Sequence, residues 1–447
     1  MYPRISFMKF GVCFLNYFTD MAILIKDIKQ IVTCSNNTSL PRCGTDQSES
    51  GIIENGNIFI DKGRIAFTGN KRQLKKFLSK NNFKKYKIID GRNKVVTPGF
   101  VDSHTHFVFA GSRENEYEMR LAGKSYQEIA ESGGGIISTV DSVRKTSKKE
   151  LKKIAEKRLE KFVRYGTTTV EGKSGYGLDV KNEIKILEVL NKLNEKNKYG
   201  LDIVPTFLGA HSVPKGKTKT EYVKEICELM IPEIAGRKLA KFTDIFIEEN
   251  YFDTVDADMI FSKGLEYGLI PKLHTDQFTS IGGINTAIKY NAASVDHLEV
   301  LGTEDILKLS EYNGQHNNRK IIATLLPGVS YFLNISYQPA RELINNNIPV
   351  ALATDFNPGS CMTENIQMIM SLASLKLKMN AEEILNAVTI NAAFALNMEK
   401  IIGSIETGKQ ADLNIFDIPS YKYIVYNFGV NNIEMVLKKG KIIYEAN

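Results

Sequence analysis

The feature that most constrains the fold is a series of eight short apolar runs separated by longer amphipathic segments. The intervening segments, such as residues 148–163 and 181–193, place their apolar residues at helical spacing. Eight strand–helix units in about 300 residues are typical of a parallel (β/α)8 TIM barrel, although an open doubly wound sheet fits the same count. The runs are residues 95–106, 167–173, 203–211, 242–248, 269–274, 294–297, 321–326 and 349–355.

Histidines and one aspartate stand at the C-terminal ends of these runs, the edge where the barrel fold places its catalytic groups. Five of the six histidines in the chain lie at such ends, and only His316, in a hydrophilic stretch, does not. We therefore predict one shared site at the barrel mouth. Its members are His104, His106, His211, His274, His297 and Asp355.

Part of this set is suited to a metal ion. His104 and His106 are two residues apart, so on an extended strand both imidazoles face the same side. That spacing alone is a weak signal, but with His274 and Asp355 it gives three imidazoles and one carboxylate. This set suits one Zn²⁺ or iron ion with a position left for water. Such an ion lowers the pKa of bound water from about 16 toward about 7.

Two residues are candidates for proton transfer at this centre. Asp355 can bind the metal and also accept a proton while a carbonyl is attacked. His297 can hold or deprotonate the metal-bound water, or it can be a core histidine that only supports its neighbours. We expect His297 and Asp355 to be the catalytic residues.

Other polar residues near the run ends are candidates for substrate contacts. Arg113 can hold a carboxylate through two parallel hydrogen bonds, and Tyr176 lies in a glycine-flanked loop that suits ligand contact. A surface arginine and simple loop packing are the alternatives. With the metal fully liganded, His211 is expected to bind substrate. The loop after Asp355 can offer further hydrogen bonds, although its Asn-Pro-Gly sequence is also that of an ordinary turn; its candidates are Asn357, Gly359 and Ser360.

Both ends of the chain contain short strand-like runs bounded by Gly, Asp and Asn. We expect residues 21–95 and 401–447 to meet in one small β-sandwich beside a barrel of residues 96–400. Residues 35–51 are polar and turn-rich and are interpreted as a surface insertion. Residues 1–20 are an extension of uncertain status: a disordered segment, a stretch upstream of the working start, or a targeting segment.

The composition of the chain limits the classes of partner that we expect for it. The net charge is +7 over 447 residues, but the lysines alternate with glutamates along helical segments, as on a solvated face. The longest apolar stretch is well short of the roughly 18 residues that span a membrane. Five cysteines show no paired spacing, which favours a reducing compartment. We therefore expect a cytoplasmic protein with a small-molecule substrate and no nucleic-acid or membrane partner, and we leave a homodimer open.

These residues resemble a known group of enzymes. Residues 97–106, with the sequence TPGFVDSHTH, are similar to the metal-binding opening of the amidohydrolase superfamily. Residues 403–413 resemble the return of that superfamily to its sandwich domain. Within it, the imidazolonepropionase family is the closer match, through residues 106–113, 133–136, 171–178, 207–211 and 353–360.

The resemblance implies specific roles. His104, His106, His274 and Asp355 would bind one Zn²⁺ or Fe³⁺, because the lysine that bridges a second metal in some relatives has no counterpart at the fourth strand. Some relatives carry glutamate where this chain has Gln277, and a glutamine cannot act as a base. The implied substrate contacts are Arg113, Tyr176, His211, Gln277, Asn357, Gly359 and Ser360.

The resemblance also implies a reaction. Metal-bound hydroxide would hydrolyse the cyclic amide of 4-imidazolone-5-propanoate to N-formimidoyl-L-glutamate, the third step of histidine degradation. An aminohydrolase that removes ammonia from a nucleobase would use the same metal ligands, and Arg113 with Tyr176 argues against it. A barrel used only as a binding scaffold is the third alternative, and the complete ligand set disfavours it.

Overall fold

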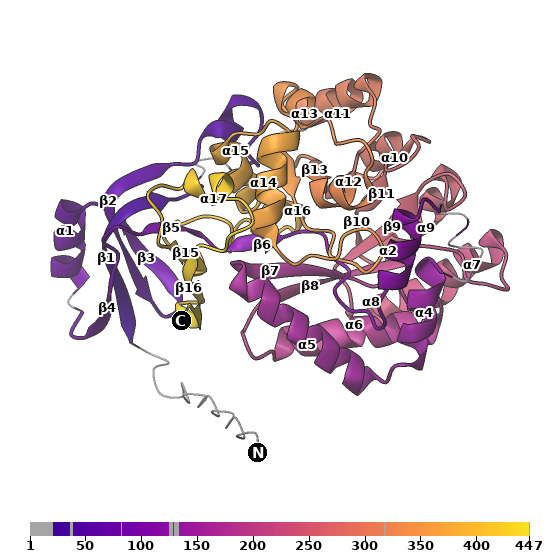
Figure 1. Cartoon of the computed structure of the whole chain (residues 1–447), viewed down its shortest axis with the longest axis horizontal. Helices are drawn as coiled ribbons and strands as arrows, with labels where there is room; N and C mark the ends of the chain where they lie inside the picture. Colours follow the sequence, from indigo (N-terminus) through magenta and orange to yellow (C-terminus); the bar gives the residue numbers. More distant parts are fainter. Residues whose placement is uncertain are drawn as a thin grey trace, which may run out of the picture.

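A computed structural model describes residues 21–35, 39–81, 83–124, 128, 134–316 and 319–446. It contains two sheets (Figure 1). One is built from both ends of the chain and the other from its middle. Figure 1 shows the strands from both ends of the chain together at one end of the molecule, with the barrel and its helices at the other. No helix among the described residues is both long and apolar enough to cross a membrane.

The middle of the chain forms a parallel barrel, as predicted. Neighbouring strands follow the order β14-β13-β12-β11-β9-β8-β7-β6, with β10 (Ile270–Pro271) beside β9. The strands are β6 (Phe100–Asp102), β7 (Thr167–Lys173), β8 (Asp202–Ala210), β9 (Phe242–Ile247), β11 (Leu273–Thr275), β12 (Ser294–His297), β13 (Ile322–Leu325) and β14 (Val350–Leu352).

The barrel closes just beyond its first and last strands. Thr105 forms a parallel bridge with Phe356, and the Asp355 amide donates to the His104 carbonyl at 3.0 Å. The His106 amide donates to the Phe356 carbonyl over the same distance. The closure therefore brings into direct contact the two segments, after β6 and after β14, that carry predicted metal ligands.

The helices around the barrel follow from local sequence. In α5 (Lys148–Arg164) the Ser147 side chain accepts from the Glu150 amide and caps the first turn. Leu151, Ala155 and Leu159 recur every four residues and are buried. The remaining helices are α2 (Glu114–Leu121), α4 (Ile136–Lys145), α6 (Val180–Glu195), α7 (Lys219–Glu225), the π-helix η2 (Ile226–Met230), α8 (Ile231–Gly236), α9 (Thr254–Glu266), α10 (Gly283–Lys289), α11 (Thr303–Gln315), α12 (Pro327–Leu333), α13 (Ala340–Asn345), α14 (Ile366–Lys376), α15 (Ala381–Ala387) and α16 (Ile390–Ala395).

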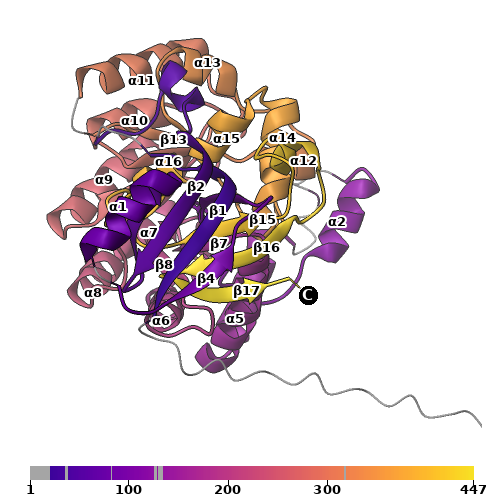
Figure 2. The same ribbon diagram turned by 90° about the vertical axis from the view of Figure 1, so that its left-hand side faces the viewer.

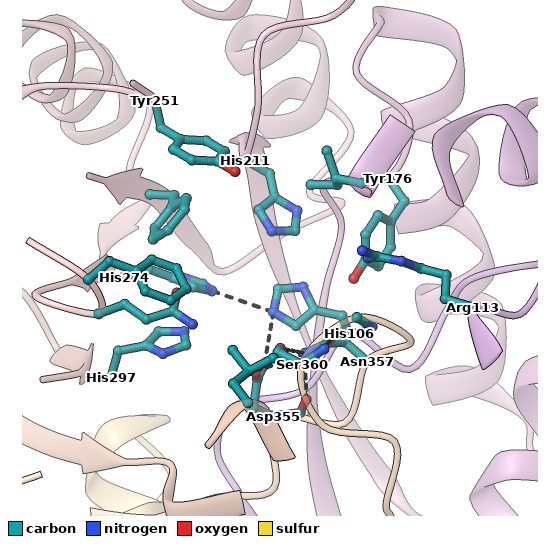
Figure 3. Close-up of a pocket in the computed structure, with 16 residues that line it drawn as sticks. His106, Arg113, Tyr176, His211, Tyr251, His274, His297, Asp355, Asn357 and Ser360 are labelled. Carbon is teal, nitrogen blue, oxygen red and sulfur yellow. Dashed lines mark hydrogen bonds and ion pairs between the residues drawn. The ribbon is translucent and has the colours of Figure 1, made fainter. Parts of the chain in front are cut away.

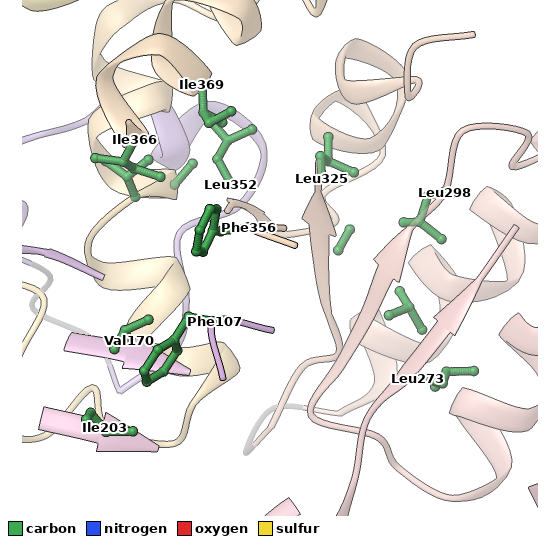
Figure 4. Close-up of a cluster of buried hydrophobic side chains, with 14 of the residues drawn as sticks. Phe107, Val170, Ile203, Leu273, Leu298, Leu325, Leu352, Phe356, Ile366 and Ile369 are labelled. Atoms are coloured by element: carbon green, nitrogen blue, oxygen red, sulfur yellow. The ribbon is translucent and has the colours of Figure 1, made fainter. Parts of the chain in front are cut away.

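The main hydrophobic core lies between the barrel strands and these helices. Val170, Ile203, Leu273 and Leu352 are fully or almost fully buried in it (Figure 4). Because these outward-facing residues take the apolar contacts, the inward-facing positions near the mouth are free to carry polar groups. The apolar residues of the predicted runs therefore lie on the outer face of the barrel wall.

The two ends of the chain form a second, eight-stranded sheet (Figure 2). Its path is β17-β16-β15-β5-β1-β2-β3, with β4 beside β1. The prediction that both termini contribute to one β structure is confirmed. Its elements are β1 (Ala22–Val32), β2 (Ile52–Asp61), β3 (Arg64–Gly69), β4 (Tyr86–Asp90), β5 (Val95–Pro98), β15 (Leu413–Phe416), β16 (Ile433–Lys438) and β17 (Lys441–Glu445), with helices α1 (Lys71–Asn81) and α17 (Tyr423–Tyr426).

Three details of the strand prediction were wrong. The run 95–106 is divided at Gly99 between β5 of the terminal sheet and β6 of the barrel. Glycine is needed there because a Cβ would come within 2.3 Å of the Thr168 hydroxyl. Residues 22–25 and 30–33 were predicted from sequence as two separate strands, but residues 22–32 form one strand, β1, interrupted by a bulge after Ile25 where Asp27 has φ 57°. Helix α1 and strand β4 were not predicted.

The prediction of a surface insertion over residues 35–51 was also wrong for its later part, while residues 36–38 lie outside the described residues. A short 3-10 helix, η1 (Gly44–Ser48), packs against α13 and α15. The Gln47 side chain is fully buried. Its amide donates to the Val350 carbonyl at 3.0 Å and accepts from the Val350 amide at 3.1 Å, as a neighbouring strand would. The segment is polar because it bonds to backbone. The extension 1–20 lies outside the described residues.

A buried ion pair joins the terminal sheet to the barrel. The Lys438 ammonium on β16 is 2% exposed and lies 2.7 Å from Asp412 and 2.8 Å from Asp202, at the start of β8. The neighbouring Lys439 reaches the same Asp202 carboxylate from a half-exposed position. Lys438 therefore connects the terminal sheet to the barrel from a buried position.

We predict that Lys438→Met lowers the free energy of unfolding by about 3–5 kcal/mol, because it leaves the buried Asp412 carboxylate without a cation and Asp202 with Lys439 alone. Lys439→Met is the matched control and should cost about 0–1 kcal/mol, as exposed pairs do. Urea unfolding followed by circular dichroism measures both. Equal effects of the two substitutions would show that burial of Lys438 does not govern the stability of this junction.

Candidate metal and substrate site

The six residues predicted at the strand ends are brought to one place at the C-terminal edge of the barrel, and Figure 3 shows all of them except His104. His104 and His106 follow β6, and His211 follows β8. His274 lies in β11, and His297 is the last residue of β12. The sixth residue, Asp355, follows β14. His316, the histidine left out of the prediction, lies exposed beyond α11.

Four donor groups converge on one point. The Asp355 Oδ1 atom lies 3.4 Å from Nε2 of His104 and 3.4 Å from Nε2 of His106. Nε2 of His274 is 3.4 Å from that of His106. Ligands about 2.0–2.2 Å from a tetrahedral ion stand about 3.3–3.6 Å apart. The observed separations therefore fit the edges of such a coordination shell.

Hydrogen bonding supports the same interpretation. His104 Nε2 and Asp355 Oδ1 are buried and have no hydrogen bond to any described residue. Leaving such atoms unpaired in a protein interior is costly unless another group satisfies them. A metal ion would satisfy both atoms, so the residues present fit the ion that the sequence predicts. His297 forms a second, overlapping group with His104 and His274, whose donor atoms lie within 4.8 Å of one another.

Two aspartates fix the orientation of the histidines. Asp296 Oδ2 lies 2.7 Å from His104 Nδ1, and Asp244 Oδ1 lies 3.1 Å from His274 Nδ1. A carboxylate can only accept, so each Nδ1 carries the proton and each Nε2 is left with its lone pair facing the shared point. The sequence analysis missed both aspartates. Their signal was their position, since each sits inside a barrel strand where an apolar residue is usual.

Two buried lysines neutralise these carboxylates. The Lys173 ammonium lies 2.6 Å from Asp244, 3.0 Å from Glu171 and 3.5 Å from Asp296. Lys272 lies 2.9 Å from Glu171. Burial alone would lower the pKa of Lys173, but the carboxylates of Asp244 and Glu171 outweigh it and raise that pKa. Lys173 therefore stays protonated beneath the metal ligands.

Counting these charges favours a divalent ion. Lys173 and Lys272 pair with three buried carboxylates, and Asp355 beside the histidines is a fourth, all taken as ionised. The balance is two negative charges, and an uncompensated charge in a protein interior is strongly unfavourable. One divalent cation at the converging nitrogen and oxygen atoms would neutralise the group.

The loop after β14 holds Asp355 in place. Its Oδ2 atom accepts from Asn357 Nδ2 at 2.8 Å and from Ser360 Oγ at 3.0 Å. The Asn357 side-chain oxygen, Oδ1, accepts in turn from the backbone amides of Gly359 and Ser360. Asp355 itself has φ 50°, and His297 has φ 88°. Such conformations cost about 1–3 kcal/mol and are concentrated at functional sites.

The substrate contacts predicted from sequence all line one cavity of about 640 Å³, mouth included. His106, His274, His297 and Asp355 form its floor. The structure therefore places these residues where the prediction requires them, while their roles remain predictions. They are Arg113, Tyr176, His211, Gln277, Asn357, Gly359 and Ser360.

His211 is set up as an acceptor. Its Nδ1 atom lies 3.0 Å from the Gly175 carbonyl, so Nδ1 carries the proton. Burial, with a contribution from His106, lowers the pKa of His211 to about 3. The ring is therefore neutral at pH 7 and its Nε2 can accept a hydrogen bond. It stacks on the His106 ring with centroids 5.2 Å apart.

The cavity has an apolar wall that the sequence analysis missed. It consists of Phe246 in β9, Leu333 at the end of α12, and Tyr251 and Phe278 in loops. Each lies in a stretch that shows no pattern beyond ordinary hydrophobicity, so only the folded chain brings them together. Such a wall excludes water from one side of a bound ring and strengthens the polar contacts on the other.

Comparisons with known proteins agree with this geometry. The model of the amidohydrolase family matches residues 273–443. The fold is also that of the triazine hydrolase from Arthrobacter aurescens, with a TM-score of 0.71, 15% identity and 95% of each chain covered. The barrel and its histidine–aspartate cluster thus define an amidohydrolase.

Relatives with higher sequence identity indicate a more specific family. The chain is 43% identical to an imidazolonepropionase of Shouchella clausii, over 95% of this chain and 93% of that protein. It is 41% identical to an imidazolonepropionase of Clostridium tetani, over 95% of this chain and 99% of that protein. The chain belongs to the imidazolonepropionase family.

We predict that Asp296→Asn weakens metal binding about 10-fold to 100-fold, because His104 loses the carboxylate that fixes its ring. Competition with a fluorescent chelator measures the affinity, and elemental analysis gives the metal content. Asp258→Asn, at an exposed pair with Lys289, is the control. Unchanged metal affinity in folded Asp296→Asn protein would contradict the orienting role.

Proposed function

We propose that this chain hydrolyses the ring amide of 4-imidazolone-5-propanoate to N-formimidoyl-L-glutamate, the third step of histidine degradation. The observation that carries the proposal is one cavity with a metal-type floor at one end and Arg113 at the other. The family relatives support it through their names, imidazolonepropionase. A cytoplasmic location fits a metabolic enzyme of this kind.

The metal set is part of the proposal. His104, His106, His274 and Asp355 would hold one Zn²⁺ or Fe³⁺ ion, and the charge balance beneath them favours a divalent one. When bound, such an ion polarises a carbonyl and makes water acidic enough to supply a nucleophile at neutral pH. Lys173 already occupies the space between Glu171, Asp244 and Asp296, which argues for one ion per chain.

The reaction adds the oxygen of water to the ring carbonyl carbon and breaks the bond from that carbon to the adjacent ring nitrogen. The oxygen ends in the new carboxylate, and one proton passes to the nitrogen that leaves. His297 and Asp355 both face the cavity and are the groups that move this proton. Gln277 also lines the cavity, but its amide can only hydrogen bond.

The remaining residues orient the substrate. Arg113 would bind the propanoate, and neutral His211 would accept from a ring N–H. Tyr176 lies beside His106 and His211, with ring centroids 5.9 and 5.4 Å away, and would pack on the ring. Holding the ring this way converts a collision into an oriented encounter, which is a large part of enzymatic rate enhancement.

The proposed function predicts that the protein turns over 4-imidazolone-5-propanoate. Purified protein should consume 4-imidazolone-5-propanoate, generated in place from urocanate, with loss of its ultraviolet absorbance. Chelation should abolish the reaction. Arg113→Ala should lower kcat/KM about 10-fold to 150-fold, the loss expected for one charge-assisted hydrogen-bonded contact. Metal-loaded protein without turnover would refute the substrate assignment and leave a hydrolase of another cyclic amide or a nucleobase aminohydrolase.

A second prediction separates the proton-transfer group from the metal ligands. His297→Gln should lower kcat about 100-fold to 10,000-fold, as loss of a general base does, while the metal content stays near one ion per chain. Gln277→Ala should act mainly on KM. If His297→Gln instead loses the metal, His297 is a ligand, as the overlapping histidine group would allow.

A further inference from the structure

Helix α2 rests on few contacts. It buries no side chain, yet Arg113 at its N-terminal cap lines the cavity. On its outer side Tyr117 stacks on Phe332 of α12, with ring centroids 5.1 Å apart. A helix without a buried face is held in position by individual side-chain contacts. The contact nearest the cavity is made by Glu116.

The guanidinium of Arg113 is held on two sides. Its Nε atom lies 2.7 Å from Glu116 Oε2, and the two side chains are only 9% and 13% exposed. Its Nη1 atom lies against Gly359, where a Cβ would come within 2.3 Å. With Nε engaged, the two Nη groups remain for a ligand, and a carboxylate is the group that their parallel N–H bonds match.

Glu116 is itself anchored to the barrel. Its other oxygen, Oε1, accepts from the Ser138 hydroxyl at 3.1 Å. Ser138 lies in the first turn of α4 and also contacts the Gly135 carbonyl at 3.0 Å. Ser138 and Glu116 therefore link the guanidinium of Arg113 to α4. Among the described residues, Glu116 is the only acid paired with Arg113.

We propose that Glu116 is a positioning residue that presets Arg113 for the terminal carboxylate of the substrate. This inference rests on the proposed function, because it takes Arg113 to be the carboxylate contact. The residue acts through Arg113 and does not line the cavity itself. It occupies one edge of the guanidinium and leaves the other edge to the ligand, which fixes the distance between the carboxylate and the metal ligands.

The expected effect is on binding. Without Glu116 the arginine side chain regains rotamers that must be lost again when substrate binds. The cost of ordering one long side chain corresponds to a rise in KM of about 2-fold to 12-fold. The contact is the same in the ground state and the transition state, so kcat should stay within about 2-fold. Glu116→Gln, which keeps an acceptor oxygen, should give a smaller rise.

An opposite effect is physically conceivable and makes the test decisive. Glu116 is itself a carboxylate and repels the charge of an incoming carboxylate. If repulsion dominated, its removal would lower KM. The proposal therefore requires an increase, and a decrease or no change would overturn it.

The experiment compares Glu116→Ala, Glu116→Gln and Arg113→Ala with the double variant, using the metal-loaded full chain. Glu118→Ala is the matched control, because Glu118 is an exposed acid on the same helix. Removing Glu116 should raise KM in the wild-type background and change nothing further when Arg113 is already alanine. Circular dichroism and metal content should be unchanged in every variant.

Direct binding separates this inference from the proposed reaction. Imidazole-4-propanoate has the same side chain but no ring carbonyl, so calorimetry measures its affinity without turnover. The inference is supported if Glu116→Ala loses about 2-fold to 12-fold in affinity when Arg113 is present and loses nothing further when Arg113 is alanine. This holds even if no imidazolone is hydrolysed. Loss in Arg113→Ala but none in Glu116→Ala overturns it while leaving the carboxylate contact intact. No binding by the wild type overturns both.

Discussion

The interaction on which the site depends is the buried charge network beneath the histidines. Asp296 and Asp244 turn the rings of His104 and His274 so that both Nε2 atoms face one point. These carboxylates could not remain charged in the barrel interior without Lys173 and Lys272 beside them. The network thus fixes the tautomers of His104 and His274.

The architecture provides this arrangement at little cost to the core. Outward-facing residues such as Val170 and Leu352 pack against the helices, and inward-facing ones are left for charged groups. The barrel closure between Thr105 and Phe356 then joins the first and last ligand-bearing segments. His297 and Asp355, with their positive φ angles, lie at the mouth of the barrel.

Much of this was predictable from sequence. The eight apolar runs, the helical segments predicted at 148–163 and 181–193, and the cluster of strand-end histidines are local patterns, because side-chain periodicity and strand ends depend on neighbouring residues. The predictions that were wrong have a physical explanation. The Gln47 segment reads as polar surface, but its polarity serves backbone hydrogen bonds to Val350, 303 residues away in sequence.

The sequence by itself determined the barrel, the residue types at its mouth and, through resemblance, the family. Only the tertiary structure decided which carboxylate orients which histidine, since Asp296 and His104 are 192 residues apart and nothing local links them. It also decided that a lysine from the second barrel strand, Lys173, fills the space among three acids. Pairings of this kind depend on distances through space, which periodicity along the chain does not encode.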